Sequence, residues 1–483
     1  MKKTNIIFIL ADDMGYGDVS CLNENCVFET PNLDRLAKEG MKFTDGHSTS
    51  ALCTPSRYSI LTGRYNWRSR LKSGIVMGFS PALIEEGRQT FAGMLRDNGY
   101  KTACVGKWHL GMDWEKDENG DIKYGEAIKN GPLGRGFDYF FGVSASLDLE
   151  PYVYIENDRA AGIPNRQYEG IPWGNPAFAR PGPIAEDFKH EEVLPRLTEK
   201  VLDKIDEYKD DPFFIYFPLT APHSPTLPSE EFIGKSGTNE YGDFCLMCDA
   251  MVGKVMDKLD EHGIADNTMI VFTADNGCAP HANFEELASF GHNPNYVFRG
   301  HKADIYEGGH RIPLLVRWPE VTAPGSVCDD TVCLCDFFAT AADILKIDLD
   351  DATAEDSVSI LRILENKDYL KPIREATVHH SANGSLSIRK GSFKLEMCPG
   401  SGGWSYPNPK KDDTTGMPDI QLYDLNADIG ERQNIYDKHP EVVDELKNLL
   451  VKYIVSGRST PGSSQPNNGA EIWESVSWLK EYL

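Results

Sequence analysis

The chain contains 483 residues, 74 of them acidic and 49 basic, which gives a formal net charge of −25 at pH 7. This length exceeds what one small core can organise, so we expect two or three domains. Because no stretch of the chain is strongly basic, the negative charge argues against nucleic acid and anionic membrane surfaces as partners, and an anionic substrate would need positive charge gathered locally at its site.

The N-terminal stretch leads into a short apolar run, Ile6–Leu10, and Asp12 follows almost at once. The run is too short for a secretion signal with its cleavage site or for a membrane span, so we expect a cytoplasmic protein with no membrane partner. The eleven cysteines are scattered and odd in number, which favours reduced thiols over a disulfide framework. A signal segment removed from this sequence would undo the expectation.

Residues 5–10 are predicted to form a fully buried parallel strand, because polar residues flank a short apolar run. The run ends in Asp12 and Asp13, and ligands of open α/β sheets bind at the carboxyl ends of the strands. Two adjacent carboxylates repel each other unless a cation lies between them, so a hard divalent metal explains the pair. The alternative is an ordinary solvated turn.

Segments 30–40 and 50–64 are each predicted to contain a helix. Thr30 is the expected cap of the first helix, and Thr54 or Ser56 is the expected cap of the second.

The second helix carries reactive residue types at its start. Its N-terminus presents unpaired N–H groups that suit an anion, and Arg57 adds a cation whose forked donors match sulfate or phosphate. Cys53 comes just before it. Taken alone, this cysteine is either a reactive group or a small buried hydrophobe, and the residues themselves leave both interpretations open.

Polar residues also follow the next predicted strand, 101–105, which comes after an amphipathic helix at 90–100. Lys107 and His109 share one side of the chain only if the backbone stays extended. Residues 112–200 are rich in Gly, Pro, Asn and Asp, so we expect long loops over the active-site edge, where specificity usually resides. Three side chains there could face a sugar, but nothing separates them from ordinary loop residues: Asp148, Glu150 and Trp173.

Two further predicted strands end in polar residues. Strand 212–217 is followed by His223, which stands on a stiff loop between two prolines and is a candidate general acid. Strand 269–274 ends in Asp275 and Asn276. Their oxygens would complete the oxygen-ligated metal site begun at the first strand.

A helix predicted over 241–263 contains Cys245 and Cys248 at a spacing that invites a zinc or redox interpretation. Both lie on the apolar stripe of the helix, and no second pair stands at a suitable distance. We therefore predict core packing for them, and likewise for Cys333 and Cys335.

The composition changes after about residue 370. We expect a catalytic α/β domain over residues 1–372 and a smaller C-terminal α+β subdomain, with a tail, over residues 373–483. The predicted elements of the latter are antiparallel strands within 385–398, a strand at 421–425 and a helix at 440–455.

Five motifs, in order along the chain, resemble those of the formylglycine-dependent sulfatases, and two of them are Thr30-Pro-Asn-Leu-Asp-x-Leu-Ala37 and the strand end at His223. Cys53-Thr-Pro-Ser-Arg57 followed by Leu-Thr-Gly-Arg resembles the first signature of that family, and Gly-Lys107-Trp-His-Leu-Gly resembles the second. The segment 300–311 (Gly-x-Lys, then Glu-Gly-Gly-x-Arg) is similar to one that supplies a second sulfate-binding lysine. The resemblance covers nearly the whole chain. It implies an alkaline-phosphatase-like α/β fold, with a large mixed sheet sandwiched by helices and a smaller C-terminal sheet.

The resemblance also implies which residues do the chemistry. It implies a Ca²⁺ site, with Mg²⁺ as the alternative, formed by Asp12, Asp13, Asp275, Asn276 and the modified Cys53. The catalytic residues it implies are Cys53, Arg57, Lys107, His109, His223 and Lys302, and the substrate-binding residues are Lys107, His223, His292 and Lys302.

In this family the cysteine is oxidised to formylglycine by a maturation enzyme, either a formylglycine-generating or an anaerobic one, and the aldehyde hydrate is the nucleophile. The resemblance implies that Arg57 supports the hydrate and that His223 protonates the leaving alcohol, with help from Lys302. His109 would remove the proton of the second hydroxyl, which expels sulfate.

The long loops and His292 ahead of Lys302 resemble carbohydrate sulfatases. We expect exo-acting removal of sulfate from galactose or N-acetylgalactosamine, as in small chondroitin or dermatan fragments. A broad aryl sulfatase is the nearest alternative. A phosphonate monoester or phosphodiester hydrolase of the same superfamily, and a sugar-binding protein with an unmodified Cys53, are the others.

Overall fold

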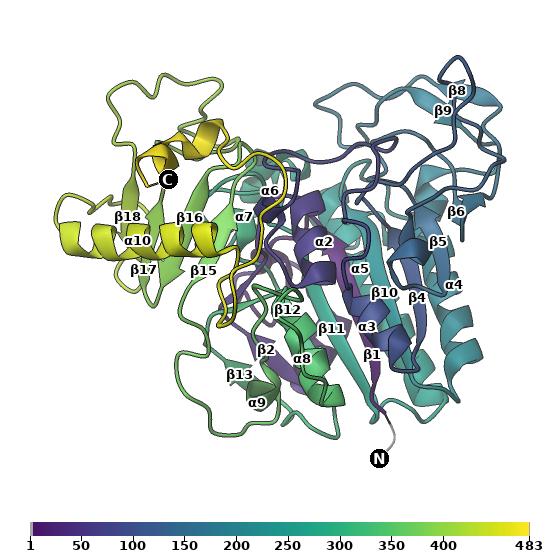
Figure 1. The fold of residues 1–483 in the computed structure, drawn as a ribbon. Coiled ribbons are helices and arrows are strands. Elements are labelled where there is room, and N and C mark those ends of the chain that lie inside the picture. Colours follow the sequence, from purple (N-terminus) through teal and green to yellow (C-terminus); the bar gives the residue numbers. More distant parts are fainter. Residues whose placement is uncertain (1–2, 483) are drawn as a thin grey trace.

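The computed structural model describes residues 3–482, and within them it forms one ten-stranded mixed sheet (Figure 1). In spatial order the strands are β13 (Ser326–Cys328), β2 (Met41–Phe43), β12 (Leu314–Arg317), β11 (Thr268–Ala274), β1 (Asn5–Asp12), β10 (Phe213–Pro222), β4 (Lys101–Lys107), β5 (Tyr139–Val143), β6 (Ile155–Glu156) and β7 (Arg159–Ala160). The central strands β11, β1, β10, β4 and β5 are parallel. The predicted buried strands are confirmed.

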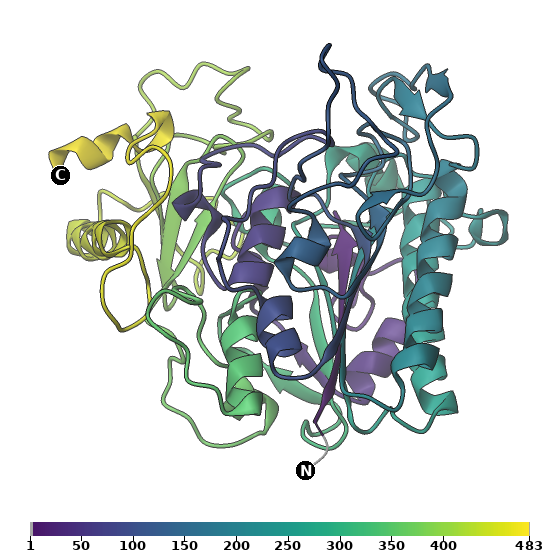
Figure 2. The ribbon, with the colours of Figure 1, turned by 45° about the vertical axis from the view of Figure 1, so that its right-hand side comes forward.

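Helices cover both faces of this sheet (Figures 1 and 2). One face carries α1 (Pro31–Lys38), α4 (Val193–Tyr208) and α5 (Glu240–Glu261), and the other carries α2 (Cys53–Thr62), α3 (Phe91–Asp97) and α8 (Asp336–Leu345). Cys245 and Cys248 are fully buried on α5, as the stripe predicted. No helix among residues 3–482 is long and apolar enough to cross a bilayer.

Residues 112–200 are mostly loops, as expected, but the stretch also contains strands that the sequence did not predict. β5 lies in this stretch and belongs to the main sheet, because the apolar run Tyr139–Val143 is buried between Gly-rich flanks that obscure it in the sequence. β8 (Arg166–Tyr168) and β9 (Gly182–Ile184) pair beyond it. Figure 1 shows the rest of the stretch over the upper ends of β4 and β5, where the carboxyl ends of the parallel strands lie.

The N-terminus of α1 is capped from another helix. The hydroxyl of Thr30, the expected cap, instead contacts the Ser20 hydroxyl at 2.8 Å. The first N–H groups of the helix, at Asn32 and Leu33, donate to the Asp249 carboxylate of α5 at 3.0 and 2.8 Å. The expectation was wrong because the better acceptor comes from far along the chain.

The C-terminal part forms its own four-stranded antiparallel sheet, the only one of its kind in residues 3–482. Its strands are β15 (Thr377–His380), β16 (Leu386–Lys390), β17 (Phe393–Glu396) and β18 (Gln421–Asp424), and α10 (Pro440–Ser456) packs against it. A second hydrophobic core lies between them, distinct from the core of the large sheet. The remaining short elements are β3 (Gly46–His47), β14 (Val332–Cys333), α6 (Phe284–Ser289), α7 (Glu307–His310) and α9 (Leu361–Leu364).

The C-terminal sheet is joined to the segment that leads into α2. The N–H of Ala51 donates to the carbonyl of His380 at 3.1 Å, and the N–H of His380 donates to the carbonyl of Thr49 at 3.3 Å. His380 of β15 thus forms a parallel bridge with Ser50. The chain just before Cys53 is therefore held by both parts of the molecule.

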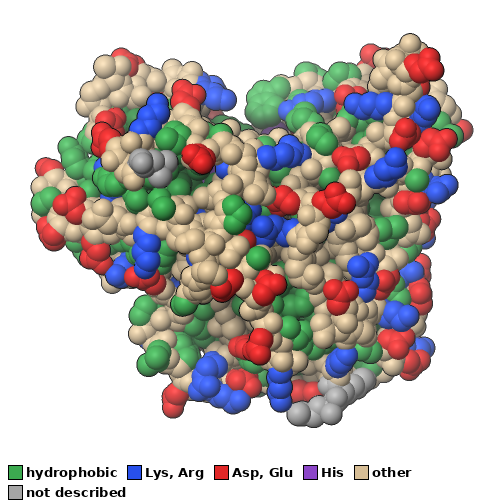
Figure 3. Space-filling model, viewed as in Figure 1, with side chains coloured by type: hydrophobic (Ala, Val, Ile, Leu, Met, Phe, Trp, Pro, Cys, Tyr) green, Lys and Arg blue, Asp and Glu red, His purple; other side chains and the backbone are tan. Residues whose placement is uncertain are grey.

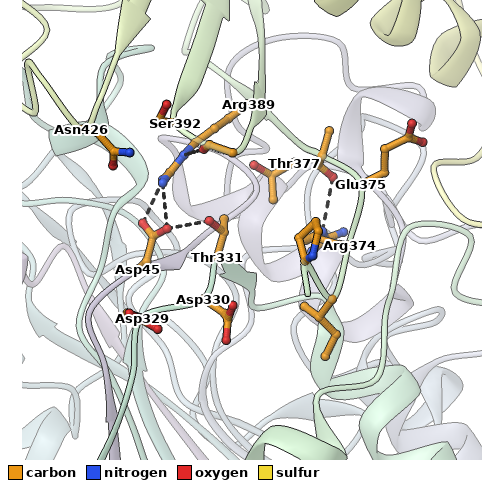
Figure 4. Close-up of a pocket in the computed structure, with 14 residues that line it drawn as sticks. Asp45, Asp329, Asp330, Thr331, Arg374, Glu375, Thr377, Arg389, Ser392 and Asn426 are labelled. Carbon is orange, nitrogen blue, oxygen red and sulfur yellow. Dashed lines mark hydrogen bonds and ion pairs between the residues drawn. The ribbon is translucent and has the colours of Figure 1, made fainter. Parts of the chain in front are cut away.

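Four buried side chains, named the histidine chain below, cross the same junction. Lys394 Nζ lies 3.1 Å from His310 Nε2, the Nδ1 atoms of His310 and His47 are 3.0 Å apart, and His47 Nε2 lies 2.9 Å from Asp45 Oδ1. At the Asp45 end, Arg389 pairs with the carboxylate beside a cavity of about 290 Å³ (Figure 4). The chain links the C-terminal sheet to the large one.

Candidate active site

Cys53 is the first residue of α2 and is 1% exposed. The residue before the helix, Leu52, is extended, and neither Thr54 nor Ser56 caps it. The hydroxyl of Thr54 donates to the carbonyl of His109 at 3.0 Å, and that of Ser56 donates to the carbonyl of Ser50 at 3.0 Å. The two hydroxyls therefore fix the start of the helix against the rest of the site.

The thiol of Cys53 is poorly suited to act as a thiolate. Burial raises its pKa, and the nearby Lys107 and Lys302 ammonium groups only partly oppose this. Reactive cysteines normally have a lowered pKa and some exposure. The unmodified thiol is thus a weak nucleophile at this position.

Arg57 joins two of the strand ends. Its Nε and Nη2 donate to Oδ2 of Asp275 at 3.0 and 2.7 Å, and Nη2 lies 3.5 Å from Asp12 Oδ1. Its Nη1 donates to the carbonyl of Lys107 at 2.9 Å, and the Lys107 ammonium donates to both Asp12 oxygens at 2.9 and 2.8 Å. All four side chains are fully buried.

Lys302 makes the matching contact with Asp13. Its Nζ donates to the two carboxylate oxygens at 2.6 and 2.7 Å. Burial would raise the pKa of Asp13, but the charges of Lys302 and His223 outweigh it and hold that pKa well below its usual value. Asn276 Nδ2 also donates to Asp13, at 2.7 Å.

These oxygens suit a divalent cation. Oδ1 of Asn276 is buried and has no hydrogen-bond partner in the described part of the chain. Burial raises the pKa of Asp275 to about 6, Arg57 opposes the shift and Asp12 adds to it, so a cation beside this carboxylate would offset the cost of burying its charge. Carboxylate and amide oxygens are the ligands that Ca²⁺ and Mg²⁺ prefer. Asp12, Asp13, Asp275 and Asn276 therefore form a fitting donor set.

His109 has one ring nitrogen without a hydrogen-bond partner in the described part of the chain. Its Nε2 lies 2.9 Å from the carbonyl of Val76, which only accepts, so the proton is on Nε2. Its Nδ1 is buried and makes no hydrogen bond to any residue of 3–482. Burial holds the pKa of this imidazole well below its usual value, and Lys107 and Arg57 add to the shift. A neutral imidazole with a free lone pair has the form of a general base.

His223 has the opposite tautomer. Its Nδ1 donates to the carbonyl of Ser224 at 2.7 Å, and its Nε2 lies 3.6 Å from Asp13 Oδ2. Burial lowers the pKa of this imidazole, although Asp13 raises it in part. The Nε2 atom therefore faces the carboxylate and Lys302 without a proton of its own.

His292 does not join this group of charges. Its Nε2 contacts Asp18 at 2.8 Å, its ring packs on Phe28, and its side chain is 1% exposed. A direct contact with substrate, which the sequence predicted, is not supported by this position. The prediction for His292 came from its place ahead of Lys302. In the structure its ring nitrogen is instead paired with Asp18, in the segment after β1.

A wall of side chains lies beside His223; the sequence indicated Asp148 and Trp173 as residues that could face a sugar, but not His281 or Phe178. Asp148 Oδ1 lies 4.0 Å from His223 Nδ1, and the His281 ring lies 6.1 Å from the His223 ring. Trp173, two-thirds exposed, packs on His281 and Phe178 at 4.6 and 5.1 Å. The signal available for His281 was its place six residues after Asp275. Phe178 carried no comparable signal.

Together these groups suit an anion bound next to a divalent cation. Three buried cations and the start of α2 supply positive charge, while His109 and His223 supply two imidazoles with bare nitrogens. The aromatic wall beside His223 supplies apolar contact for the group attached to the anion.

Comparison with known proteins agrees with this chemistry. The family model described as Sulfatase matches residues 4–347. An N-acetylgalactosamine-6-O-sulfatase of Bacteroides thetaiotaomicron is 35% identical over 93% of this chain and 93% of its own length. Arylsulfatase H of Homo sapiens is 30% identical over 76% of this chain and 73% of its own.

A solved Bacteroides thetaiotaomicron structure, described with the metabolism of multiple glycosaminoglycans, has the same fold. It superimposes with a TM-score of 0.82 at 34% identity and covers 94% of this chain and 99% of that one. The match includes the C-terminal sheet as well as the large one.

Proposed function

The chain belongs to the sulfatase family and hydrolyses sulfate esters, and we propose that its substrate is a sulfated sugar, with the 6-sulfate of N-acetylgalactosamine as the first candidate. The 35% identical relative from Bacteroides thetaiotaomicron, an N-acetylgalactosamine-6-O-sulfatase, supports this choice. We further propose exo action on galactose or N-acetylgalactosamine sulfate in chondroitin- or dermatan-type fragments. The observation that carries the proposal is the convergence of Cys53, three cations and three aspartates at one edge of the sheet.

We propose that a maturation enzyme converts Cys53 to formylglycine. The hydrated aldehyde supplies a nucleophilic oxygen that the buried, protonated thiol of Cys53 does not. A divalent cation, Ca²⁺ or alternatively Mg²⁺, would be held by Asp12, Asp13, Asp275 and Asn276. It supplies polarisation of the sulfate oxygens and acidification of a neighbouring hydroxyl.

The residues of the chain then have distinct tasks. Lys107 and Lys302 donate to Asp12 and Asp13 in this structure, and when substrate binds they give up part of these contacts to donate to the sulfate oxygens. Arg57 keeps its contact with Asp275 and fixes the start of α2. His109 accepts a proton at Nδ1. His223 carries a proton at Nε2 to the leaving alcohol, and the negative charge of the bound substrate favours its protonation.

Sulfate release from a panel of sulfated monosaccharides tests the substrate. Enzyme co-expressed with a maturation enzyme should cleave N-acetylgalactosamine 6-sulfate faster than its 4-sulfate or glucosamine sulfates. Cys53→Ala should abolish turnover, whereas Cys104→Ala, which removes another buried thiol from β4, should retain it. Mass spectrometry should find aldehyde at position 53 in proportion to activity. Full activity of Cys53→Ala would contradict the proposal.

Broad aryl sulfatase activity is the second candidate, and the apolar wall of Trp173 and Phe178 favours it. Nitrophenyl sulfate, nitrophenyl phosphonate and a phosphodiester belong in the same panel. Higher kcat/KM on nitrophenyl sulfate than on every sugar would favour the aryl sulfatase, and preference for a phosphorus centre would favour the phosphonate or diester hydrolase. Tight binding of sulfated sugar without turnover by matured enzyme would favour a binding protein.

A further inference from the structure

The backbone just after Lys302 is in an unfavourable conformation. Ala303 has φ = +82°, a region that residues with a Cβ rarely adopt, and it is fully buried. Its N–H donates to the carbonyl of Ala51 at 2.8 Å, and its carbonyl accepts from the N–H of Ala382 at 2.9 Å. The segment leading to Cys53 and the C-terminal sheet thus hold this turn from two sides.

Asp304, the next residue, fastens the turn from within. Its Oδ2 accepts from the N–H of His301 at 2.9 Å, so one side chain closes the turn that contains Lys302. Its Oδ1 accepts from the N–H groups of Trp404 and Ser405 at 2.7 and 3.0 Å. The carboxylate is fully buried, and His301 Nδ1, at 3.7 Å, is its nearest charge-bearing partner among the described residues.

Trp404 and Ser405 belong to the loop between β17 and β18, which is part of the C-terminal sheet. This loop meets the turn very closely: a Cβ at Gly403 would lie 2.3 Å from the carbonyl oxygen of Ala303 and 2.6 Å from Asp304 Oδ1. The N–H of Ile305 also donates to the carbonyl of Ser401 at 2.8 Å. The loop and the turn are therefore in close contact over several residues.

We propose that Asp304 is a positioning residue for Lys302, and that through it the C-terminal sheet sets where the lysine ammonium lies. The inference rests on the proposed role of Lys302 in binding sulfate. Asp304 itself touches no reacting atom. Its three backbone contacts fix the turn whose lysine side chain reaches Asp13.

The test measures inorganic sulfate binding by calorimetry in Cys53→Ala protein, which does not turn over, so binding is read without catalysis. Lys302→Ala should weaken binding by about tenfold, and Asp304→Ala by nearly as much. The double variant Lys302→Ala/Asp304→Ala should bind no more weakly than Lys302→Ala alone, because a residue that acts through Lys302 has nothing left to position.

Asp304→Asn serves if Asp304→Ala fails to fold. The amide in Asp304→Asn keeps one oxygen that can accept from the 404–405 loop, but its NH₂ group then faces the N–H of His301, which it cannot accept from. The variant should therefore lose part of its sulfate affinity while keeping its melting temperature. Asp412→Ala is the matched control, since Asp412 accepts from the N–H of Asn408 in the same loop without touching the lysine turn. Its sulfate affinity should stay within twofold.

Additive losses in the double variant, or unchanged binding in Asp304→Ala and Asp304→Asn, would overturn the inference and leave the proposed function standing. Absence of sulfate binding in the parent, together with no sulfate release from any substrate, would instead overturn the proposed function and this inference with it.

Discussion

At the scale of single residues, the two histidines of the site differ in which nitrogen carries the proton. His109 holds its proton on Nε2 against a carbonyl and presents Nδ1, whereas His223 holds its proton on Nδ1 and presents Nε2. His109 can act as a general base in this form, because its Nδ1 carries no proton. His223 can act as a general acid only after its Nε2 has gained a second proton.

The leaving group therefore separates the two roles. The alkoxide of a sugar sulfate needs a proton and nitrophenolate does not, so His223→Ala should slow sugar-sulfate turnover by about a hundred- to ten-thousand-fold and nitrophenyl sulfate far less. In His109→Ala the alcohol should be released once per enzyme in a burst, followed by a stall. Stopped-flow alcohol release on both substrates measures this. Equal slowing of both substrates by His223→Ala, or no burst in His109→Ala, would refute the assignment.

The pH profile of kcat/KM offers an independent check. Burial lowers the pKa of His223 below its usual 6.5, and an acid is active only in its protonated form. Sugar-sulfate kcat/KM should thus fall as pH rises through that pKa, giving an acidic optimum. Nitrophenyl sulfate should lack this alkaline limb. The same alkaline limb for both substrates, or one that persists in His223→Ala, would argue against His223 as its source.

At the scale of elements, the site exists because four parallel strands end at one edge with matched registers. Ala11 pairs with Ala274, and Asp12 pairs with Pro222. The residues that follow each strand therefore meet although they are far apart in sequence. Gly106 permits the approach of β4 to β10, since a Cβ there would lie 1.9 Å from the carbonyl oxygen of Pro218.

The capping of α1 by α5 gives a prediction at this scale. Asp249→Ala leaves two backbone N–H groups unpaired, which should lower the free energy of unfolding by about 1–3 kcal/mol. Burial raises the pKa of Asp249 to about 6 from 3.8, so between these values the folded protein keeps a proton that the unfolded chain releases. The loss should consequently grow as pH falls from about 6 to about 4.

Urea unfolding of Asp249→Ala at several pH values measures this loss. Asp257→Ala is the control on the same helix, because its exposed pair with Arg35 should contribute no more than about 1 kcal/mol. A loss in Asp249→Ala no larger than in Asp257→Ala would show that the cap is unimportant.

Much of this architecture could be predicted from the sequence because its signals are local. A strand such as 5–10 is an apolar run with polar ends, and Cys53 stands within a motif. The cap at Asp249 could not be predicted, since it lies more than 200 residues from the N–H groups it accepts. Asp304 looks like any loop acid until the 404–405 loop is packed against it. The sequence supplied residue types, and only the fold supplied their partners.

At the scale of the whole molecule, the two sheets meet through polar contacts as well as apolar ones. Figure 3 shows a notch at the top of the molecule between the C-terminal part and the segment over β4 and β5. The polar contacts include the histidine chain, beside which the ring of His379 stacks 3.9 Å from that of His310. For His47, as for these two, burial lowers the pKa.

This junction should make stability depend on pH. Below about pH 6.5 each of these histidines binds a proton in the unfolded chain but stays neutral in the folded protein. The free energy of unfolding should therefore fall as pH falls below that value, by about 1.4 kcal/mol per pH unit for each histidine. His379→Leu should reduce the slope of the free energy of unfolding against pH by the contribution of about one proton. His439→Leu, at an exposed histidine, should leave it unchanged. Urea unfolding between about pH 5 and 6.5 measures the slopes, and equal slopes in the three proteins would contradict the prediction.

The bridge between β15 and Ser50 also bears on when Cys53 can be reached during synthesis. In the folded chain Cys53 is 1% exposed, so an enzyme that modifies it needs access before the chain is fully folded. During synthesis β15 emerges roughly 320 residues after Cys53, which at typical translation rates is about 16–65 s. The proposed conversion of Cys53 to formylglycine would then have to precede the folding of the chain's own C-terminal strands, and slower translation should yield a larger fraction of modified molecules.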